Sequence, residues 1–420
     1  MEDCPTPVPW VPQVSLLRPG KARTSTLLFT LGLLATALTG CRPHDFPEYP
    51  PNYREYAYVP NGGSATVTIL DVVNVRVDRE LPVGENSVAV AASPTRNEVY
   101  VVNSGAAGGV GSVSVIDAER NVVAATIPVG RQPVSIDVDP KGKLAYVADS
   151  GSNFVSVLDL TTRREVARIG TGEEPVAAVL APDGETLVVA NRRANSVTLI
   201  DPASRQVRSV FEGCPGAEGP VILPDSSKAF VACSAGHQVM AIALAQKDDG
   251  PAEAGAAGEA RKTPAWPRQP DQLEALMDVG RAPVDLALKP DGGEIFVSNS
   301  LSDSVSEIYD TTDEVGDTYM IGDDPVLGLV SRDNALLYVA NLRSQYVTVY
   351  SIDDGKRVGA VHVGDGPAAM AFSGAGHLLF VVDSRSDDVA VVRVASDSLF
   401  TMLPAGRDPD AIVVKAFKVQ

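Results

Sequence analysis

Charged side chains that could bind a ligand recur at one position of this chain, just before short apolar segments that begin with serine or proline. The set comprises Glu85, Arg131, Glu173, Glu174, Glu218, Arg281, Asp323, Asp324, Asp365, Arg407 and Asp408. Carboxylates outnumber guanidinium groups, so if these side chains meet at one place they favour a divalent cation or a basic ligand. The alternative is a rim of solvated charges with no ligand.

Two smaller groups of charged residues extend this candidate site. Arg192, Arg193 and Arg343 follow a second kind of apolar segment. Asp137 and Asp285 interrupt segments whose other positions are small or apolar. The two aspartates either form a paired acidic site inside the molecule or are solvated separately.

Sequence motifs for catalysis are missing from the chain. Its four histidines, His44, His237, His362 and His377, share no motif. There is no H-E-x-x-H, C-x-x-C-H or G-x-S-x-G, and no phosphate-binding loop. We therefore predict no catalytic residue and no cofactor, and a divalent cation is the one inorganic ligand that the charges suggest.

The elements that position these residues follow from a repeat of 42 residues, in which an apolar strand ends in a short polar side chain. Its copies begin with AYVPN at Ala57 and include VYVVN, AYVAD, LVVAN, AFVAC, IFVSN, LYVAN and LFVVD. Successive copies are separated by 42, 46, 42, 42, 66, 42 and 42 residues. A period of this length built from short strands predicts a β-propeller or another stacked array.

Each repeat contains four predicted strands. In one copy they cover 133–138, 144–148, 154–159 and 165–169, and D-P-K-G forms the first turn. A single sheet cannot bury both faces, whereas a ring of sheets can. The first copy lacks an inner strand, and residues 409–415 match that missing strand, so we predict eight blades closed by N-terminal strands and a C-terminal strand. Seven blades would result if the first copy lay outside the ring.

The strand motif, the V-G-x-x-P approach to inner strands and third strands of the N-S-V-S-V-I-D type resemble the YVTN family of β-propellers, which includes YncE-like periplasmic proteins. The likeness covers about residues 55–420. It implies the propeller fold but not one activity, because related propellers serve as binding platforms, surface-layer modules and occasionally lactonases.

The N-terminal region predicts export and lipidation. Basic residues precede an apolar run at 27–38, which ends in L-T-G-C at Cys41. This pattern is similar to a bacterial lipobox, so we expect 1–40 to be a signal peptide and Cys41 to be diacylated. Arg42 replaces the aspartate that often retains such proteins at the inner membrane, which favours the outer membrane, facing the periplasm or cell surface. Residues 41–54 are rich in proline and predict a stiff tether.

Two further features concern the surface and the redox state. Residues 246–270 account for the long interval and predict a loop insertion. Cys214 and Cys233 belong to one repeat of an exported chain and predict a disulfide, with free buried thiols and metal ligation as the alternatives. The net charge of −18 makes nucleic acid an improbable partner, because binding its phosphates needs clustered Lys and Arg.

Two functions remain open from the sequence. The first is a non-catalytic, lipid-anchored platform that binds a protein, peptide or glycan in the bacterial cell envelope. The second is a lactonase-like, metal-dependent hydrolase whose acids and arginines at the channel mouth hold a metal and activate water. A hydrolase of this kind needs several ligands within about 2.0 to 2.6 Å of one point.

Overall fold

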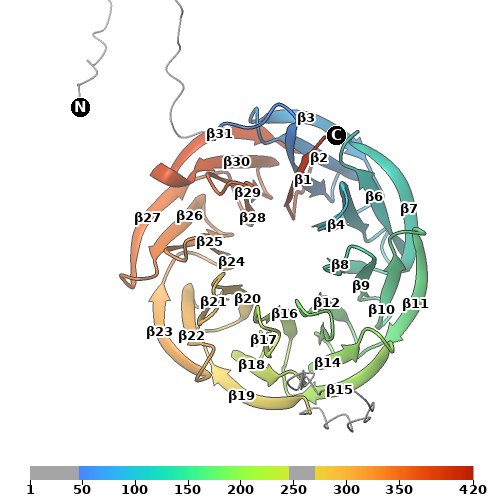
Figure 1. Ribbon diagram of the computed structural model, residues 1–420. Coiled ribbons are helices and arrows are strands. Elements are labelled where there is room, and N and C mark those ends of the chain that lie inside the picture. The colour runs from blue at the N-terminus through green and yellow to red at the C-terminus, as the bar shows by residue number, and fades with distance from the viewer. Residues whose placement is uncertain (1–46, 246–269, 420) are drawn as a thin grey trace, which may run out of the picture. The chain divides into compact units, whose positions relative to one another are not determined.

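The computed structural model describes residues 47–245 and 270–419. Eight antiparallel sheets of four strands each are arranged in a ring around a central axis (Figure 1). This arrangement confirms the predicted all-β propeller with eight blades. In the description below, blade 1 is the blade that begins with β4, and blade 8 is the closing blade.

The first four blades each use four consecutive strands. Blade 1 is β4 (Ser87–Ala92), β5 (Glu98–Asn103), β6 (Val110–Asp117) and β7 (Val122–Arg131), and blade 2 is β8 (Pro133–Val138), β9 (Leu144–Asp149), β10 (Phe154–Asp159) and β11 (Arg164–Gly170). Blade 3 is β12 (Pro175–Leu180), β13 (Leu187–Asn191), β14 (Ser196–Asp201) and β15 (Gln206–Glu212), and blade 4 is β16 (Ala217–Ile222), β17 (Lys228–Cys233), β18 (Gln238–Ala243) and β19 (Gln272–Asp278).

The remaining blades include the one that closes the ring. Blade 5 is β20 (Pro283–Leu288), β21 (Glu294–Asn299), β22 (Ser304–Tyr309) and β23 (Glu314–Met320), and blade 6 is β24 (Pro325–Val330), β25 (Leu336–Asn341), β26 (Tyr346–Ser351) and β27 (Lys356–His362). Blade 7 is β28 (Pro367–Phe372), β29 (Leu378–Asp383), β30 (Asp388–Arg393), the 3-10 turn η1 (Val394–Ser396) and β31 (Ser398–Pro404). Blade 8 is β1 (Tyr53–Asn61), β2 (Thr66–Asp71), β3 (Arg76–Pro82) and β32 (Val413–Lys418).

The second strand of each blade forms the core because it is covered on both faces by neighbouring blades. The second position of the five-residue sequence motif in this strand carries Tyr58, Tyr100, Tyr146, Val188, Phe230, Phe296, Tyr338 or Phe380, none more than 2% exposed. The fourth strand β11 alternates exposed positions with half-buried or buried ones, since only one of its faces contacts the core. The repeated aromatic therefore contributes to blade packing.

The short polar residue that ends each second strand is also buried. Asn191 Nδ2 donates to Thr198 Oγ1 at 2.9 Å, and Ser156 donates to Asp149 Oδ2 at 2.6 Å. Asparagine occupies this position in five blades, as Asn61, Asn103, Asn191, Asn299 and Asn341. The glycine of the V-G-x-x-P segment packs against this residue: a Cβ on Gly130 would lie 2.6 Å from Cγ of Asp149. This close approach explains the recurring glycine.

Strands from both ends of the chain close the ring. In blade 8 the order is β3-β2-β1-β32, and β32 contacts both β28 and β4. The inner strand lies closer to the C-terminus than the expected 409–415, and Pro409 forms only an isolated bridge with Asn61. The pairing extends toward the C-terminus because β1 is nine residues long and its first residue, Tyr53, pairs with Lys418.

Several expected boundaries also need adjustment. The tether was expected to reach residue 54, but β1 begins at Tyr53. Glu218 lies within β16 and not in the turn before it, because the inner strand of blade 4 begins at Ala217 and shifts register after Glu218. The signal peptide, Cys41 and nearly all of the 246–270 insertion lie outside the described residues. None of the described helices is long and apolar enough to span a membrane.

Candidate functional site

Two sets of loops meet at one end of the ring, which we call the mouth. The lead-in turns are the turns that precede the inner strands, and their carbonyls accept hydrogen bonds from the loops that follow the second strands. In blade 1, Ser104 N donates to Asn86 O at 2.8 Å and Gly105 N to Glu85 O at 2.9 Å. In blade 2, Ser150 N donates to Gln132 O at 3.0 Å. These backbone contacts place the two candidate groups at the same end of the molecule.

The charged residues singled out in the sequence differ in exposure at this mouth. The exposed members are Glu85, Arg131, Glu173, Arg192, Arg193, Arg281, Asp323, Arg343, Arg407 and Asp408. Glu174, Glu218 and Asp365 are half-buried, and Asp324 is buried. The mouth is therefore a charged rim that surrounds the channel, with both signs interspersed.

Several of the arginines are paired with carboxylates next to them. Arg192 Nη2 lies 2.6 Å from Glu218 Oε2, and Arg193 Nε lies 3.2 Å from Glu174 Oε2. Exposed pairs of this kind contribute little to stability, but they neutralise charge locally. Within residues 47–245 and 270–419 no three His, Cys, Asp or Glu side chains are grouped to hold a metal ion. The charges of the rim are thus spread around it.

The same pairing occurs in blade 6, where Arg343 Nε lies 3.2 Å from Asp324 Oδ2. In blade 5, Arg281 instead donates from Nη2 to the carbonyl of Leu301 at 2.7 Å. Both contacts hold a loop that follows a second strand against the lead-in turn of its own blade. We conclude that these arginines help to shape the mouth.

Asp137 and Asp285 connect neighbouring blades and do not form a pair with each other. Asp137 accepts from Leu180 N at 2.7 Å, and Asp285 accepts from Gly328 N at 2.8 Å. Each acceptor contact joins one inner strand to the next one around the ring. Burial raises the pKa of Asp137, and burial raises the pKa of Asp285 to about 6. The structure therefore contradicts the interpretation as a paired acidic site, because each carboxylate accepts a hydrogen bond from a backbone N–H of the next blade.

Cys214 and Cys233 are joined by a disulfide, with their Cα atoms 4.7 Å apart. Cys233 occupies the position that is Asn or Asp in the other blades, and Cys214 lies in the segment before β16. In blade 4 a covalent bond thus replaces the polar contacts at this position, and neither sulfur is left to bind a metal.

A cavity of about 870 Å³ opens at the mouth over blades 1 to 3. It is lined by Asn86, Val88, Ser104, Gly105, Ala106, Ala107, Gln132, Val134, Ser150, Gly151, Asn153, Glu173, Glu174 and Arg193. Valines of two inner strands lie among amide, hydroxyl and charged groups. A volume of this size suits a small molecule or a few residues of a polymer.

The loop from Ser104 to Gly109 is the part of this cavity that sequence reasoning missed. It is rich in glycine and alanine, and Gly105 and Gly108 both have a φ of 73°. It makes blade 1 longer than its neighbours, and the interval of 46 residues between two strand motifs was the available signal. The cavity is consequently a feature of one side of the ring.

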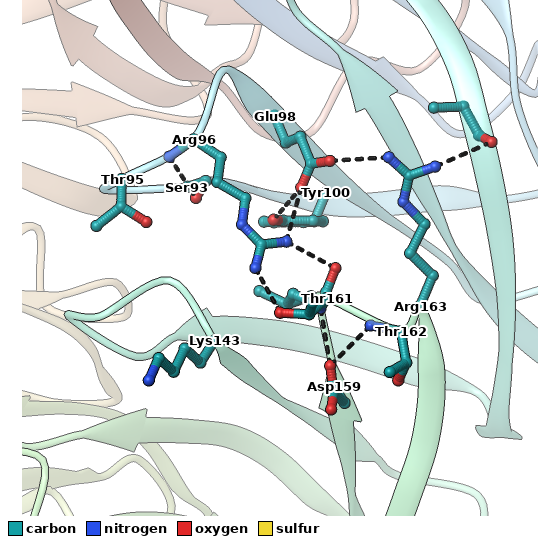
Figure 2. Close-up of polar contacts among 12 residues, drawn as sticks. Ser93, Thr95, Arg96, Glu98, Tyr100, Lys143, Asp159, Thr161, Thr162 and Arg163 are labelled. Carbon is teal, nitrogen blue, oxygen red and sulfur yellow. Dashed lines mark hydrogen bonds and ion pairs between the residues drawn. The ribbon is translucent and has the colours of Figure 1, made fainter.

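Figure 2 shows a second polar cluster, which joins blades 1 and 2. Its residues lie at the hairpins between β4 and β5 and between β10 and β11, at the end of the ring opposite the mouth. Arg96 donates to Leu160 O at 2.8 Å and to Thr161 Oγ1 at 2.6 Å, while Arg163 lies 2.9 Å from Glu98 Oε1. Both guanidinium groups bridge the two blades. We interpret this cluster as a structural connection, because both arginines and Glu98 already have protein partners.

No protein-family model and no curated protein matches the chain. Solved structures do match, and they share its fold. The dihydro-heme d1 dehydrogenase NirN is 16% identical over 89% of this chain and 77% of that chain, with a TM-score of 0.67. Apo AztD from Citrobacter koseri is 13% identical over 87% of this chain and 98% of that one, with a TM-score of 0.59.

A putative 6-phosphogluconolactonase from Bacteroides uniformis gives 15% identity over 87% of this chain and 100% of that chain, with a TM-score of 0.57. Identities this low show the fold alone. The fold of this chain defines its class, the eight-bladed β-propeller, and the structures that resemble it carry names of different functions.

Proposed function

We propose that this chain is a YVTN-type β-propeller lipoprotein, acylated at Cys41, that acts as a non-catalytic binding module in the bacterial cell envelope. Its ligand, a protein, peptide or glycan of the envelope, binds at the mouth. The lipobox pattern supports the anchor, and Arg42 supports the outer membrane. The observation that carries the binding role is the cavity of about 870 Å³, which only blades 1 to 3 line.

The cavity lies on one side of the ring, and this asymmetry favours a site that recognises a ligand. A solvated rim without a ligand would vary little from blade to blade, whereas here one blade has a longer loop that builds a wall. Exposed amide groups at Asn86 and Gln132 lie beside the apolar side chains of Val88 and Val134. Polar groups predominate in the lining, and the two valines give it a small apolar surface, so the composition suits a polar ligand with one apolar group.

The lactonase-like alternative makes a separate demand on the chain. It needs carboxylates that converge on one metal ion, with Asp323 and Asp365 as the first residues to test. The putative lactonase that shares the fold keeps this alternative worth testing, although the grouping of acids that it requires is not present among residues 47–245 and 270–419. The metal content of the purified protein and its hydrolysis of a panel of lactones decide whether the chain is such a hydrolase.

The binding role is tested by affinity capture from envelope fractions with the full-length lipoprotein. Ala107→Trp fills the cavity, and Val166→Trp on an outer strand is the matched control, since both positions are exposed. We expect one envelope component to bind the native chain and the control but not Ala107→Trp. If the same components bind all three chains equally, the mouth cavity is not the binding site.

A further inference from the structure

Neighbouring blades are joined at the mouth by a repeated side-chain bridge. In five blades, a residue near the end of the loop after the second strand accepts a hydrogen bond from a backbone N–H in the lead-in turn of the next blade. The bridges are Asn153 to Glu174 N (3.0 Å), Asn195 to Gly216 N (3.1 Å), His237 Nδ1 to Ala282 N (3.1 Å), Asp303 to Asp324 N (3.0 Å) and Asp387 to Asp408 N (2.8 Å). We call the contact between two neighbouring blades a seam. At five of the eight seams, a side-chain oxygen or ring nitrogen thus accepts from the backbone N–H at the equivalent position of the lead-in turn.

The seam between blade 8 and blade 1 has the same backbone but lacks the acceptor. Ala65 occupies the bridge position, with a φ of 55° against 57° for Asn153. Its carbonyl accepts from Val83 N at 3.0 Å, as that of Asn153 accepts from Thr171 N at 3.1 Å. The methyl group of Ala65 cannot accept a hydrogen bond, so no side chain at the bridge position accepts from Asn86 N.

The seam between blades 1 and 2 is also unbridged. The longer loop from Ser104 to Gly109 replaces the usual one, and Ser104 Oγ donates to Pro133 O at 2.5 Å instead. In the described part of the chain, neither Asn86 N nor Gln132 N has a hydrogen-bond acceptor. Blade 6 has Gln345 at the bridge position, but its seam lies away from the cavity.

These two seams coincide with the cavity, whose lining includes both Asn86 and Gln132. Both residues have positive φ, 52° and 49°, which is the conformation that presents the N–H at the bridged seams. Arg131, exposed and next to Gln132, adds a positive charge, whereas Glu85 and Glu173, also exposed, add negative charges. Arg193 in the lining is paired with Glu174. Val88 and Val134 supply an apolar surface beside these donors.

We infer that the cavity binds a peptide through a carboxylate, which accepts a hydrogen bond from Asn86 N in the place that Asn, Asp or His side chains take at the bridged seams, while a carbonyl group of the same peptide accepts from Gln132 N at the next seam. An aliphatic side chain of the peptide packs on Val88 and Val134. This inference rests on the proposed binding function and specifies its ligand. The carboxylate belongs either to a peptide C-terminus or to an acidic side chain.

Calorimetric titration of the full chain with defined probes tests this inference. The probes are acetyl-Ala-Val with a free carboxylate, acetyl-Ala-Val amide, acetyl-Asp-Val amide and trigalacturonate. We expect one or both peptide carboxylates to bind and the neutral amide to bind at least tenfold more weakly. Preference for the first probe assigns a C-terminus, and preference for the third assigns an acidic side chain. Binding of trigalacturonate alone, or no carboxylate binding, overturns the inference.

Two variant pairs identify the site. Ala65→Asn introduces the side chain that bridges other seams, and Ala65→Gly is its control without an acceptor. We expect Ala65→Asn to weaken carboxylate binding about tenfold and Ala65→Gly to leave it within twofold. Ala107→Asp should weaken it several-fold relative to Ala107→Asn through charge repulsion.

Unchanged carboxylate affinity in both Ala65→Asn and Ala107→Asp overturns the inference. The proposed function can fail or survive independently of this result. If capture of an envelope component is lost in Ala107→Trp but unaffected by Ala65→Asn, the mouth remains a binding site and only the ligand class is wrong.

Discussion

Tyr56 in the first strand of the ring lies opposite Lys415 in the last strand, within one antiparallel sheet. Contacts on both sides hold this closing blade to its neighbours. Glu55, 1% exposed, accepts from Gly374 N in blade 7, while Lys415 Nζ donates to Ser93 O in blade 1 at 2.5 Å. The ends of the described chain therefore form one blade that is packed on both faces.

Loss of packing in this blade should destabilise the whole ring. Phe417 is 8% exposed and belongs to the cluster between blades 8 and 1. We expect Phe417→Ala to lower the free energy of unfolding by about 3 kcal/mol, measured by urea denaturation. Lys418→Ala, on the exposed side of the same strand, should change it by less than about 0.5 kcal/mol. Equal effects would show that β32 does not close the ring.

The disulfide of blade 4 can be tested by thiol labelling. Without reductant we expect neither Cys214 nor Cys233 to react with iodoacetamide after unfolding, and both to react once reduced. Replacing both with alanine should cost about 3 kcal/mol, because the closed loop restricts the unfolded chain. Labelling of both cysteines without reductant would contradict the bridge.

Glycine at the V-G-x-x-P position is required by packing in blade 2. In Gly130→Ala the new Cβ would lie 2.6 Å from Cγ of Asp149, so we expect a loss of about 1 to 3 kcal/mol. Gly170 ends β11, and a Cβ there would meet no atom within 4 Å. Gly170→Ala should therefore be nearly neutral in thermal unfolding. A neutral Gly130→Ala would refute the proposed reason for the recurring glycine.

Asp149 should make stability depend on pH. Burial raises the pKa of Asp149 to about 7, whereas an unfolded aspartate titrates near pH 4. Between these values the folded chain holds a proton that the unfolded chain has lost, so stability falls as pH rises toward 7. Asp149→Asn, which introduces the residue of five other blades, should remove this loss and add on the order of 2 kcal/mol at pH 8 but nothing at pH 4.

Asp159→Asn provides the control of opposite sign for this measurement. A backbone hydrogen bond from Thr162 lowers the pKa of Asp159, so its contribution to stability is present above pH 4 and is lost as pH falls. Its replacement should lower stability at neutral pH. The account of Asp149 is wrong if Asp149→Asn gives the same gain at pH 4 and pH 8.

Much of the fold was predictable because strand period and turn chemistry are local properties. The repeat of the aromatic strand with a fixed phase gave both the number of blades and the closing arrangement. The extent of β32 was less predictable than its register, since it depends on how far β1 extends before Tyr56. Glu218 was misplaced because an irregular register in β16 leaves no mark in the alternation of apolar residues.

The candidate site was predictable only in its location. Charged turns at equal phase must lie at the same end of a ring, which the contacts between Ser104 and Asn86 illustrate. The partners of Asp137 and Asp285 are backbone amides of neighbouring blades, and no side-chain pattern identifies such a partner. The cavity likewise depends on the path of one loop.

The central claim is that the mouth cavity over blades 1 to 3 is the binding site. Site-specific photocrosslinking tests this claim most directly. A photoreactive amino acid replaces Gln132 in the cavity or Val166 on an outer strand of the lipoprotein, which is then irradiated with envelope extract. We predict one specific adduct at position 132, which excess native lipoprotein without the photoreactive residue competes away, and none at position 166. Adducts of the same identity and yield at both positions would contradict the account.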